Sequence, residues 1–197
     1  MAESNSKNGK ETGKWLSYEG YSFVEWFMLV RKNQTIKEKN MRRKDREITD
    51  FNEIIDIIKK CDVCRIALND EDYPYIVPLN FGLDVQGNQV FFYFHAAMEG
   101  KKLDLIAKDN RVTFEMDCDH NFILYEEKMS CTMGYASVIG HGTIETVADE
   151  DKYESLKILM RQYHAEDFQF NTDMMKITTV LKMTVTDMLG KRRNNIH

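Results

Sequence analysis

The strongest constraint on the fold is a series of short strand-like segments joined by tight turns. β-Branched and aromatic residues cluster, often in alternation with polar ones, in the runs VCRIALN, YPYIVPLNFGL, QVFFYFH, RVTFEMD, SVIGHGTIETV and KITTVLKMTVTDML. An acidic break at Asp70–Asp72 joins the first two runs as a hairpin, and a turn at Gln86–Asn88 introduces the third. We therefore expect a mainly β fold of about six strands, an antiparallel barrel with peripheral helices at its ends, and no parallel doubly wound sheet.

Three helices are predicted around these strands. Asp50 and Glu53 can cap a helix that ends near Lys60 and repeats its apolar residues at helical spacing. A second helix is expected over Glu99–Asn110. A third is expected over Glu150–Tyr163, behind a capping Asp149, with an apolar face formed by Leu156, Leu159, Met160 and Tyr163.

The chain is predicted to hold one domain, residues 48–197, preceded by an N-terminal extension, residues 1–47. Residues 31–47 are polar and mostly basic, as in a linker. The aromatic-rich stretch Trp15–Val30 before them contains Glu19 and Glu25 and is shorter than the roughly 20 apolar residues of a spanning helix. We interpret it as an arm or helix that packs on this domain or on a partner, with membrane attachment as the alternative.

Charge and motifs exclude several classes of protein. The formal net charge is −5 and the basic residues are scattered, which argues against a nucleic-acid partner. The opening MAESNSKNGKETGK lacks the apolar core of a signal peptide, and the four cysteines lack the spacing of secreted scaffolds. We therefore expect a cytoplasmic protein without a membrane partner. No GxSxG, P-loop or dinucleotide-binding fingerprint occurs.

No metal site is expected. Cys61-x-x-Cys64 has zinc or redox spacing, but no second such pair occurs, and we interpret it as two semi-buried thiols. The neighbouring residues Cys118–His120 are predicted to lie in a loop, where adjacent side chains seldom converge on one ion. His141, with glycine on both sides, marks a possible strand bulge near a ligand.

Two lysines at the predicted start of the second helix are the most informative local feature. Lys101 and Lys102 face the positive end of the helix dipole, which costs roughly 0.3–1 kcal/mol per charge. A phosphate at this terminus would accept bonds from the free N–H groups and from both ammonium groups. The alternative is that both side chains turn into solvent. Just before them, the strand ends at His95, and the small Ala96 and Ala97 would let a flat ring approach the backbone.

Four segments, in this order and spacing, carry a family resemblance: RIALNDEDYPYIVPLNFG, FFYFHAAMEGKKLDLI, RVTFEMD and YASVIGHGTIE. Together they resemble the pyridoxamine 5'-phosphate oxidase-like flavoproteins, which have the FMN-binding split-barrel fold. Within that group they are most similar to the nitroimidazole-resistance (Nim) branch, which has a similar PLNFG strand and a similar histidine-to-basic-pair loop. The resemblance covers Ile48–Arg192.

The resemblance implies a cofactor and a set of contacts. The cofactor would be FMN, with FAD as an alternative, bound at the interface of a homodimer. Its phosphate would contact Arg65, Lys101 and Lys102, and its ring would lie against the backbone of His95 and Ala96 and of four residues of the preceding hairpin: Val77, Pro78, Leu79 and Asn80. Ser137 matches a position that often approaches the cofactor from the other subunit.

Departures from the oxidase pattern limit the implied chemistry. Ala96-Ala97 and Lys101-Lys102 replace a Thr-Asn and an Arg-Lys pair, and the C-terminal substrate-binding segment is not found, which argues against oxidation of the vitamin. We expect a flavin-dependent oxidoreductase that reduces a small flat electrophile such as a nitroaromatic, with His95 as the proton-transferring residue. The alternatives are a non-catalytic flavin-binding module, acting as a cofactor store or redox-responsive partner, and a haem-binding split barrel with a histidine ligand.

Overall fold

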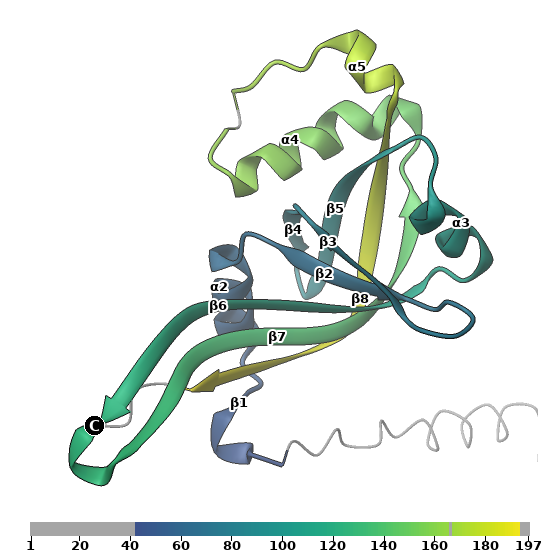
Figure 1. Ribbon diagram of the computed structural model, residues 1–197. Helices are drawn as coiled ribbons and strands as arrows, with labels where there is room; N and C mark the ends of the chain where they lie inside the picture. The colour runs from purple at the N-terminus through teal and green to yellow at the C-terminus, as the bar shows by residue number, and fades with distance from the viewer. Residues whose placement is uncertain (1–41, 166, 194–197) are drawn as a thin grey trace, which may run out of the picture. The chain divides into compact units, whose positions relative to one another are not determined.

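The computed structural model describes residues 42–165 and 167–193 (Figure 1). The chain divides into two compact units, Met1–Arg42 and Arg43–His197, and the second contains the fold described below. Residues 43–47, which the sequence suggested to be linker, belong to this second unit. The predicted aromatic arm Trp15–Val30 lies outside the described residues.

The described residues of the second unit form eight strands and four α-helices. The strands are β1 (Glu47–Ile48), β2 (Cys64–Leu68), β3 (Tyr75–Leu79), β4 (Gly82–Gln86), β5 (Gln89–Ala97), β6 (Arg111–Tyr125), β7 (Ser130–Thr146) and β8 (Thr178–Arg193). The helices are α2 (Phe51–Lys60), α3 (Lys101–Lys108), α4 (Lys152–Gln162) and the short α5 (Thr172–Lys176). Short 3-10 turns lie at Lys44–Arg46, Glu126–Lys128 and Asp149–Asp151.

All strands belong to one antiparallel sheet. Its order is β3-β2-β6-β7-β8-β5-β4, and β1 pairs with the far end of β8. The long strands β6, β7 and β8 run across the middle of the sheet, and the shorter strands curl at its two ends (Figure 1). The prediction of a mainly β, antiparallel fold with peripheral helices is confirmed.

The core fills the inside of the curled sheet. Alternate residues of β2, β5 and β6 point inward, and the largest fully buried side chains include Phe81, Phe92, Phe94 and Phe114. Phe92 is in edge-to-face contact with Phe81 at 5.6 Å and with Phe114 at 5.2 Å between ring centroids. Helix α2 closes one side of this core with four buried isoleucines, Ile54, Ile55, Ile57 and Ile58.

The three predicted helices are present, but α3 covers Lys101–Lys108 instead of Glu99–Asn110 and α4 covers Lys152–Gln162 instead of Glu150–Tyr163. The Asp50 side chain accepts a hydrogen bond from the Glu53 N–H at 2.9 Å, so the predicted cap of α2 is confirmed. The predicted cap of the third helix is wrong, because Asp149 begins a 3-10 turn and its carboxylate instead contacts the Lys152 ammonium at 2.8 Å. The short helix α5 was not predicted.

The strands differ from the prediction in number, because one run splits in two and β1 was not predicted, and in the length of β6. The run YPYIVPLNFGL forms two strands, β3 and β4, because the chain turns at Asn80 and Phe81. Strand β6 continues beyond the predicted RVTFEMD to Tyr125, through a bulge at which Asp119 has a φ of 57°. The expectation that Cys118–His120 form a loop is therefore wrong. Beyond the bulge, β6 and β7 form a hairpin that extends from the barrel (Figure 1).

Helix α4 packs directly on the start of β4. A Cβ atom at Gly82 would lie 2.5 Å from both the Leu159 N and Cα atoms, so only glycine permits this approach. The contact fixes the place of α4 beside the corner between β3 and β4. Within the described part of the chain, no helix has the length and apolar character that crossing a membrane requires.

Candidate functional site

Two open backbone edges meet where the sheet begins to separate. β3 is the terminal strand of the described sheet and pairs there only with β2, so half of its N–H and C=O groups point away from any described strand. Pro78 suits this place because an edge strand tolerates a residue without an N–H group. β5 pairs with β4 only over Gln89–Tyr93, so Phe94–Ala97 is paired with β8 on one side and with no described strand on the other.

The register shows that these edges belong to one interrupted ladder. Gly82 of β4 lies opposite Tyr93 of β5. If this antiparallel pairing continued for three residues, back from Gly82 and forward from Tyr93, it would place Leu79 opposite Ala96. The chain instead turns at Asn80 and Phe81, and β3 pairs with β2. The predicted ring-contact residues Val77–Asn80 and His95–Ala96 therefore flank the same opening of the sheet.

Helix α3 begins four residues after β5 and brings the predicted lysines to this region. Its N-cap residue, Gly100, has a φ of 133°, which favours glycine, and no side chain caps the helix. The Lys101 ammonium lies 2.6 Å from the Asp70 carboxylate and 5.4 Å from the centre of the Tyr75 ring. This ion pair raises the pKa of Lys101 and lowers the pKa of Asp70. The ends of β2 and β3 thus adjoin the start of α3.

Lys102 differs from Lys101 in its surroundings. Its side chain is half-buried, and burial lowers the pKa of its ammonium group. Among the described residues, no carboxylate forms an ion pair with it. An anion placed at the first turn of α3 would meet this ammonium group together with N–H groups that have no partner inside the helix.

His95 lies at the exposed side of β5, opposite Val180 of β8. Ala96 follows it, half-buried and opposite Thr179. Within the described part of the chain, the His95 imidazole has no hydrogen bond or ion pair. It is therefore available to a molecule bound at the open edge of β5.

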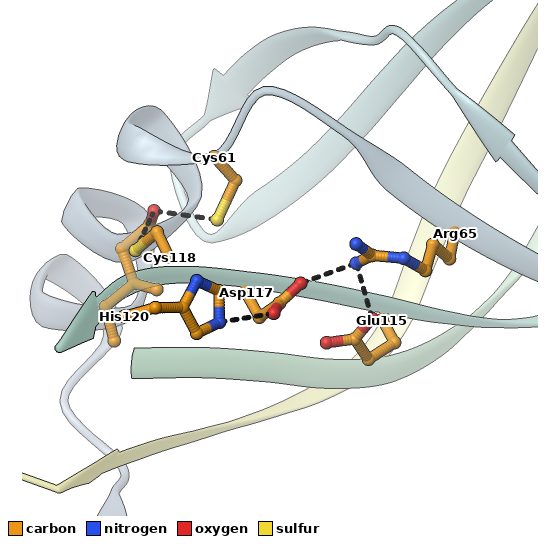
Figure 2. A network of polar contacts seen from close by, with 7 residues as sticks. Cys61, Arg65, Glu115, Asp117, Cys118 and His120 are labelled. Atoms are coloured by element: carbon orange, nitrogen blue, oxygen red, sulfur yellow. Dashed lines mark hydrogen bonds and ion pairs between the residues drawn. The ribbon is translucent and has the colours of Figure 1, made fainter. Parts of the chain in front are cut away.

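Arg65 lies at the other end of β2 from the lysines. It is opposite Pro78 on β3 and Glu115 on β6, and its guanidinium group donates hydrogen bonds to Glu115 at 3.0 Å and to Asp117 at 2.5 Å. The Asp117 carboxylate also contacts the His120 ring at 2.6 Å (Figure 2). Burial and the nearby Asp117 raise the pKa of Glu115.

This network directs the Arg65 guanidinium away from Lys101. Lys101 contacts Asp70, which lies five residues after Arg65, roughly 16 Å along an extended chain. A phosphate at Lys101 and Lys102 would reach Arg65 only if that side chain left its two carboxylates. The predicted contact between Arg65 and the phosphate stays a prediction.

Ser137 joins the Arg65 side of the molecule. It lies on β7 between Asp117 of β6 and Lys191 of β8, on the outward face of the sheet. An adjacent polar pocket of about 360 Å³ is lined by Lys60, Asp62, Val63, Arg65, Asp117, Cys118, Asp119 and His120. The predicted residues thus form two groups, one at the open edges with the lysines and one on the outer sheet face.

The other sequence motifs lie in the core and in the sheet. Cys61 and Cys64 are buried free thiols, and no cluster of possible metal ligands occurs among the described residues. The Cys61 and Cys118 thiols both lie near the Ile57 carbonyl, at 3.3 and 3.8 Å (Figure 2). The predicted bulge at His141 is present in the pairing of β7 with β8, and its ring contacts the Asp187 carboxylate at 2.9 Å.

Sequence reasoning missed two members of the lysine site, Asp70 and Tyr75. The acidic run at Asp70–Asp72 indicated only a turn, and Tyr75 only a strand residue. A turn carboxylate five residues after a strand arginine gives no local sign that it pairs with a lysine of a later helix. Only the topology brings these residues together, because the end of β2 and the start of α3 lie at the same end of the barrel.

Comparison with known proteins assigns the family. The sequence profile described as pyridoxamine 5'-phosphate oxidase matches residues 50–192. The chain belongs to this family. A search of the curated proteins gave no match.

Solved structures support the same fold. A candidate 5-nitroimidazole antibiotic resistance protein from Bacteroides thetaiotaomicron is similar at 29% identity, over 74% of this chain and 86% of that chain, with a TM-score of 0.65. The flavocytochrome Anf3 from Azotobacter vinelandii is similar at 14% identity, over 79% and 72% of the two chains, with a TM-score of 0.65. The FAD and heme binding protein from Mycobacterium smegmatis is similar at 15% identity, over 76% and 74%, with a TM-score of 0.65. The fold is the split barrel of the pyridoxamine 5'-phosphate oxidase family.

Proposed function

We propose that this chain binds a flavin, FMN in the first instance and FAD as the alternative, with its phosphate at the start of α3 and its ring at the open edges of β3 and β5. The observation that carries the proposal is Lys102, a half-buried ammonium group without a carboxylate partner among the described residues, at a helix start that also offers free N–H groups. The names of the family and of three similar structures, which mention a flavocytochrome, FAD and nitroimidazole resistance, support the same choice.

The residues present fit such a group. The unpaired N–H and C=O groups of β3 match the alternating donors and acceptors along the edge of a flavin ring. Ala96 leaves room beside the β5 backbone, and the Lys101 ammonium, already held by Asp70, adds a second positive charge near the phosphate. When bound, a flavin supplies hydride and electron transfer, and this chain's residues bind it, orient the substrate and exclude water.

The proposed reaction is the reduction of a small flat electrophile such as a nitroaromatic. His95 is the residue that would hold a proton for the reduced substrate, because its imidazole is exposed at the open edge of β5 and can both donate and accept a proton. The 29% identical protein with a role in 5-nitroimidazole resistance favours this substrate class.

Replacing His95 with Ala tests this role. We expect a 10²- to 10⁴-fold slower reoxidation of the reduced flavin by a nitroimidazole, the usual range for a lost general acid, with flavin affinity retained. Equal reoxidation rates in H95A and wild type would contradict the role. No reoxidation of the wild-type protein by nitro compounds would favour a flavin-binding module without this activity.

We further propose a homodimer in which the outer sheet face meets a second copy. Two isoleucines on this face are largely exposed: Ile76, on β3 next to the strand of Arg65, at 62%, and Ile139, on the same strand as Ser137, at 49%. Exposed apolar side chains on a sheet face favour association. Light scattering coupled to gel filtration should give twice the chain mass of 23.2 kDa. A single-chain mass would contradict the proposed dimer.

The experiment that tests flavin binding is identification of the bound molecule. The purified protein should be yellow, and heat or acid should release a flavin that chromatography identifies as FMN or FAD. A colourless protein that also fails to bind either flavin when it is added would refute the proposal. A haem absorption band without flavin would favour the haem-binding alternative.

A further inference from the structure

The hydroxyl group of Tyr163, just after the end of α4, makes three hydrogen bonds to segments far away in sequence. It donates to the Asp62 carbonyl at 2.8 Å. It accepts from the Phe81 N–H at 3.1 Å and from the Asn80 side-chain amide at 3.1 Å. A phenolic oxygen has one donor and two acceptor positions, so all of its hydrogen-bonding capacity is used at one point.

That point is the corner at which β3 becomes β4. Asn80 and Phe81 are the two residues between these strands, and the corner is where the ladder with β5 is interrupted. Phe81 is fully buried against Phe92, and Gly82 lies directly under α4. Apolar packing thus holds the corner on the side that faces the core, and the Tyr163 hydroxyl holds its backbone and the Asn80 side chain by hydrogen bonds.

We propose that Tyr163 is a positioning residue for the flavin ring: by holding Asn80 and Phe81 it sets the place and direction of the open edge of β3. The inference rests on the proposed flavin site. Residues Val77–Asn80, whose backbone is expected to contact the ring, end at the corner that Tyr163 holds. The Tyr163 hydroxyl bonds to the corner and to Asp62 and not to the start of α3, so we expect the effect at the ring rather than at the phosphate.

The variant Tyr163→Phe keeps the aromatic ring and removes all three hydrogen bonds. The Phe81 N–H, which is partly buried, loses its partner, and the corner keeps only the direct bond from the Asn80 amide to the Asp62 carbonyl, at 3.4 Å. Gln162 offers a matched control one residue away. Its side chain donates to the Lys59 and Cys61 carbonyls, both at 3.2 Å, so it ties the same end of α4 to α2 without contacting the corner.

The test compares two probes, FMN and riboflavin, which share the ring and differ in the phosphate. Apo protein of wild type, Y163F and Q162A is titrated with each probe, and quenching of flavin fluorescence gives the affinity and the stoichiometry. We expect Y163F to bind both probes about tenfold more weakly, equivalent to about 1.4 kcal/mol, with unchanged stoichiometry. We expect Q162A to bind both within about threefold of wild type and the visible absorption bands of bound FMN to shift in Y163F only.

Three results would overturn the inference. Affinities of Y163F equal to those of wild type would show that the corner does not position the ring. Equal losses in Y163F and Q162A would show a general loosening of α4, and a loss confined to FMN would place the effect at the phosphate. Failure of wild type to bind either probe would instead refute the proposed flavin site, on which the inference depends. If Y163F does not fold, the same comparison is made with Asn80→Ala, which removes two hydrogen bonds of an exposed side chain, one to the Tyr163 hydroxyl and one to the Asp62 carbonyl.

Discussion

Replacing Gly82 with Ala should destabilise the barrel, because α4 lies directly on this residue. The new Cβ atom would lie 2.5 Å from the Leu159 N and Cα atoms and 2.7 Å from the Ile158 carbonyl carbon. Ordinary contacts between carbon atoms are about 3.5–4.0 Å, so the helix must move by about 1 Å. The clash involves backbone atoms, which cannot turn aside as the end of a flexible side chain can.

The expected loss follows from two opposing terms. Overpacking a core costs about 1–3 kcal/mol, and a backbone clash belongs at the upper end of that range. Replacing glycine with alanine also restricts the unfolded chain, which contributes about 0.4–1 kcal/mol in the opposite direction. The net destabilisation of G82A is about 2 kcal/mol, which lowers the melting temperature by about 4–8 °C for a chain of this length.

Urea unfolding of G82A and a matched control measures this loss. In Gly134→Ala the new Cβ atom would meet its nearest neighbour, the Arg193 carbonyl oxygen, at 3.4 Å, an ordinary contact. We expect the free energy of unfolding of G134A to lie within about 0.5 kcal/mol of wild type. Equal stabilities of G82A and G134A would refute the described packing of α4 on β4.

Two further predictions follow from burial and charge. A maleimide should label one thiol of the native protein rapidly and four after unfolding. The reason is that Cys131 is exposed, whereas Cys61, Cys64 and Cys118 are buried. Rapid labelling of two or more thiols in the native protein would contradict the described core. Affinity for FMN should fall as the pH rises through the lowered pKa of Lys102, because the Lys102 ammonium group of the free protein then loses its proton and its charge. Riboflavin has no phosphate, so its affinity should change less. Equal pH dependence of the two affinities would contradict a phosphate at Lys102.

Local patterns in the sequence were sufficient for most of the fold. Strands with one buried face, such as the inner residues of β6 up to Cys118, show the alternation that identifies them. The pattern fails after the bulge at Asp119, because the hairpin beyond it is exposed on much of its surface and has no constant inner face. It also fails at Asn80, where an apolar run changes its pairing partner from β2 to β5, because the choice of partner depends on strands far away in sequence.

The candidate site was predictable where it depends on local sequence. Lys101 and Lys102 at a helix start and His95 at a strand end are visible as neighbours in the chain. The partners of Arg65 are 50 and 52 residues away, and those of Tyr163 lie 82 to 101 residues away. Such pairings depend on strand register and helix placement, which a single sequence does not reveal. Tyr163 accordingly was expected only as part of an apolar helix face.

The ratio of FMN to riboflavin affinity in wild type and Lys102→Gln tests the central claim most directly. If the phosphate lies at the start of α3, the variant loses a charge-assisted contact of about 1.5–3 kcal/mol with FMN and none with riboflavin. The ratio should therefore fall by about 10- to 100-fold, while riboflavin affinity remains that of wild type. An unchanged ratio, with FMN still bound, would place the phosphate elsewhere and contradict the proposed site.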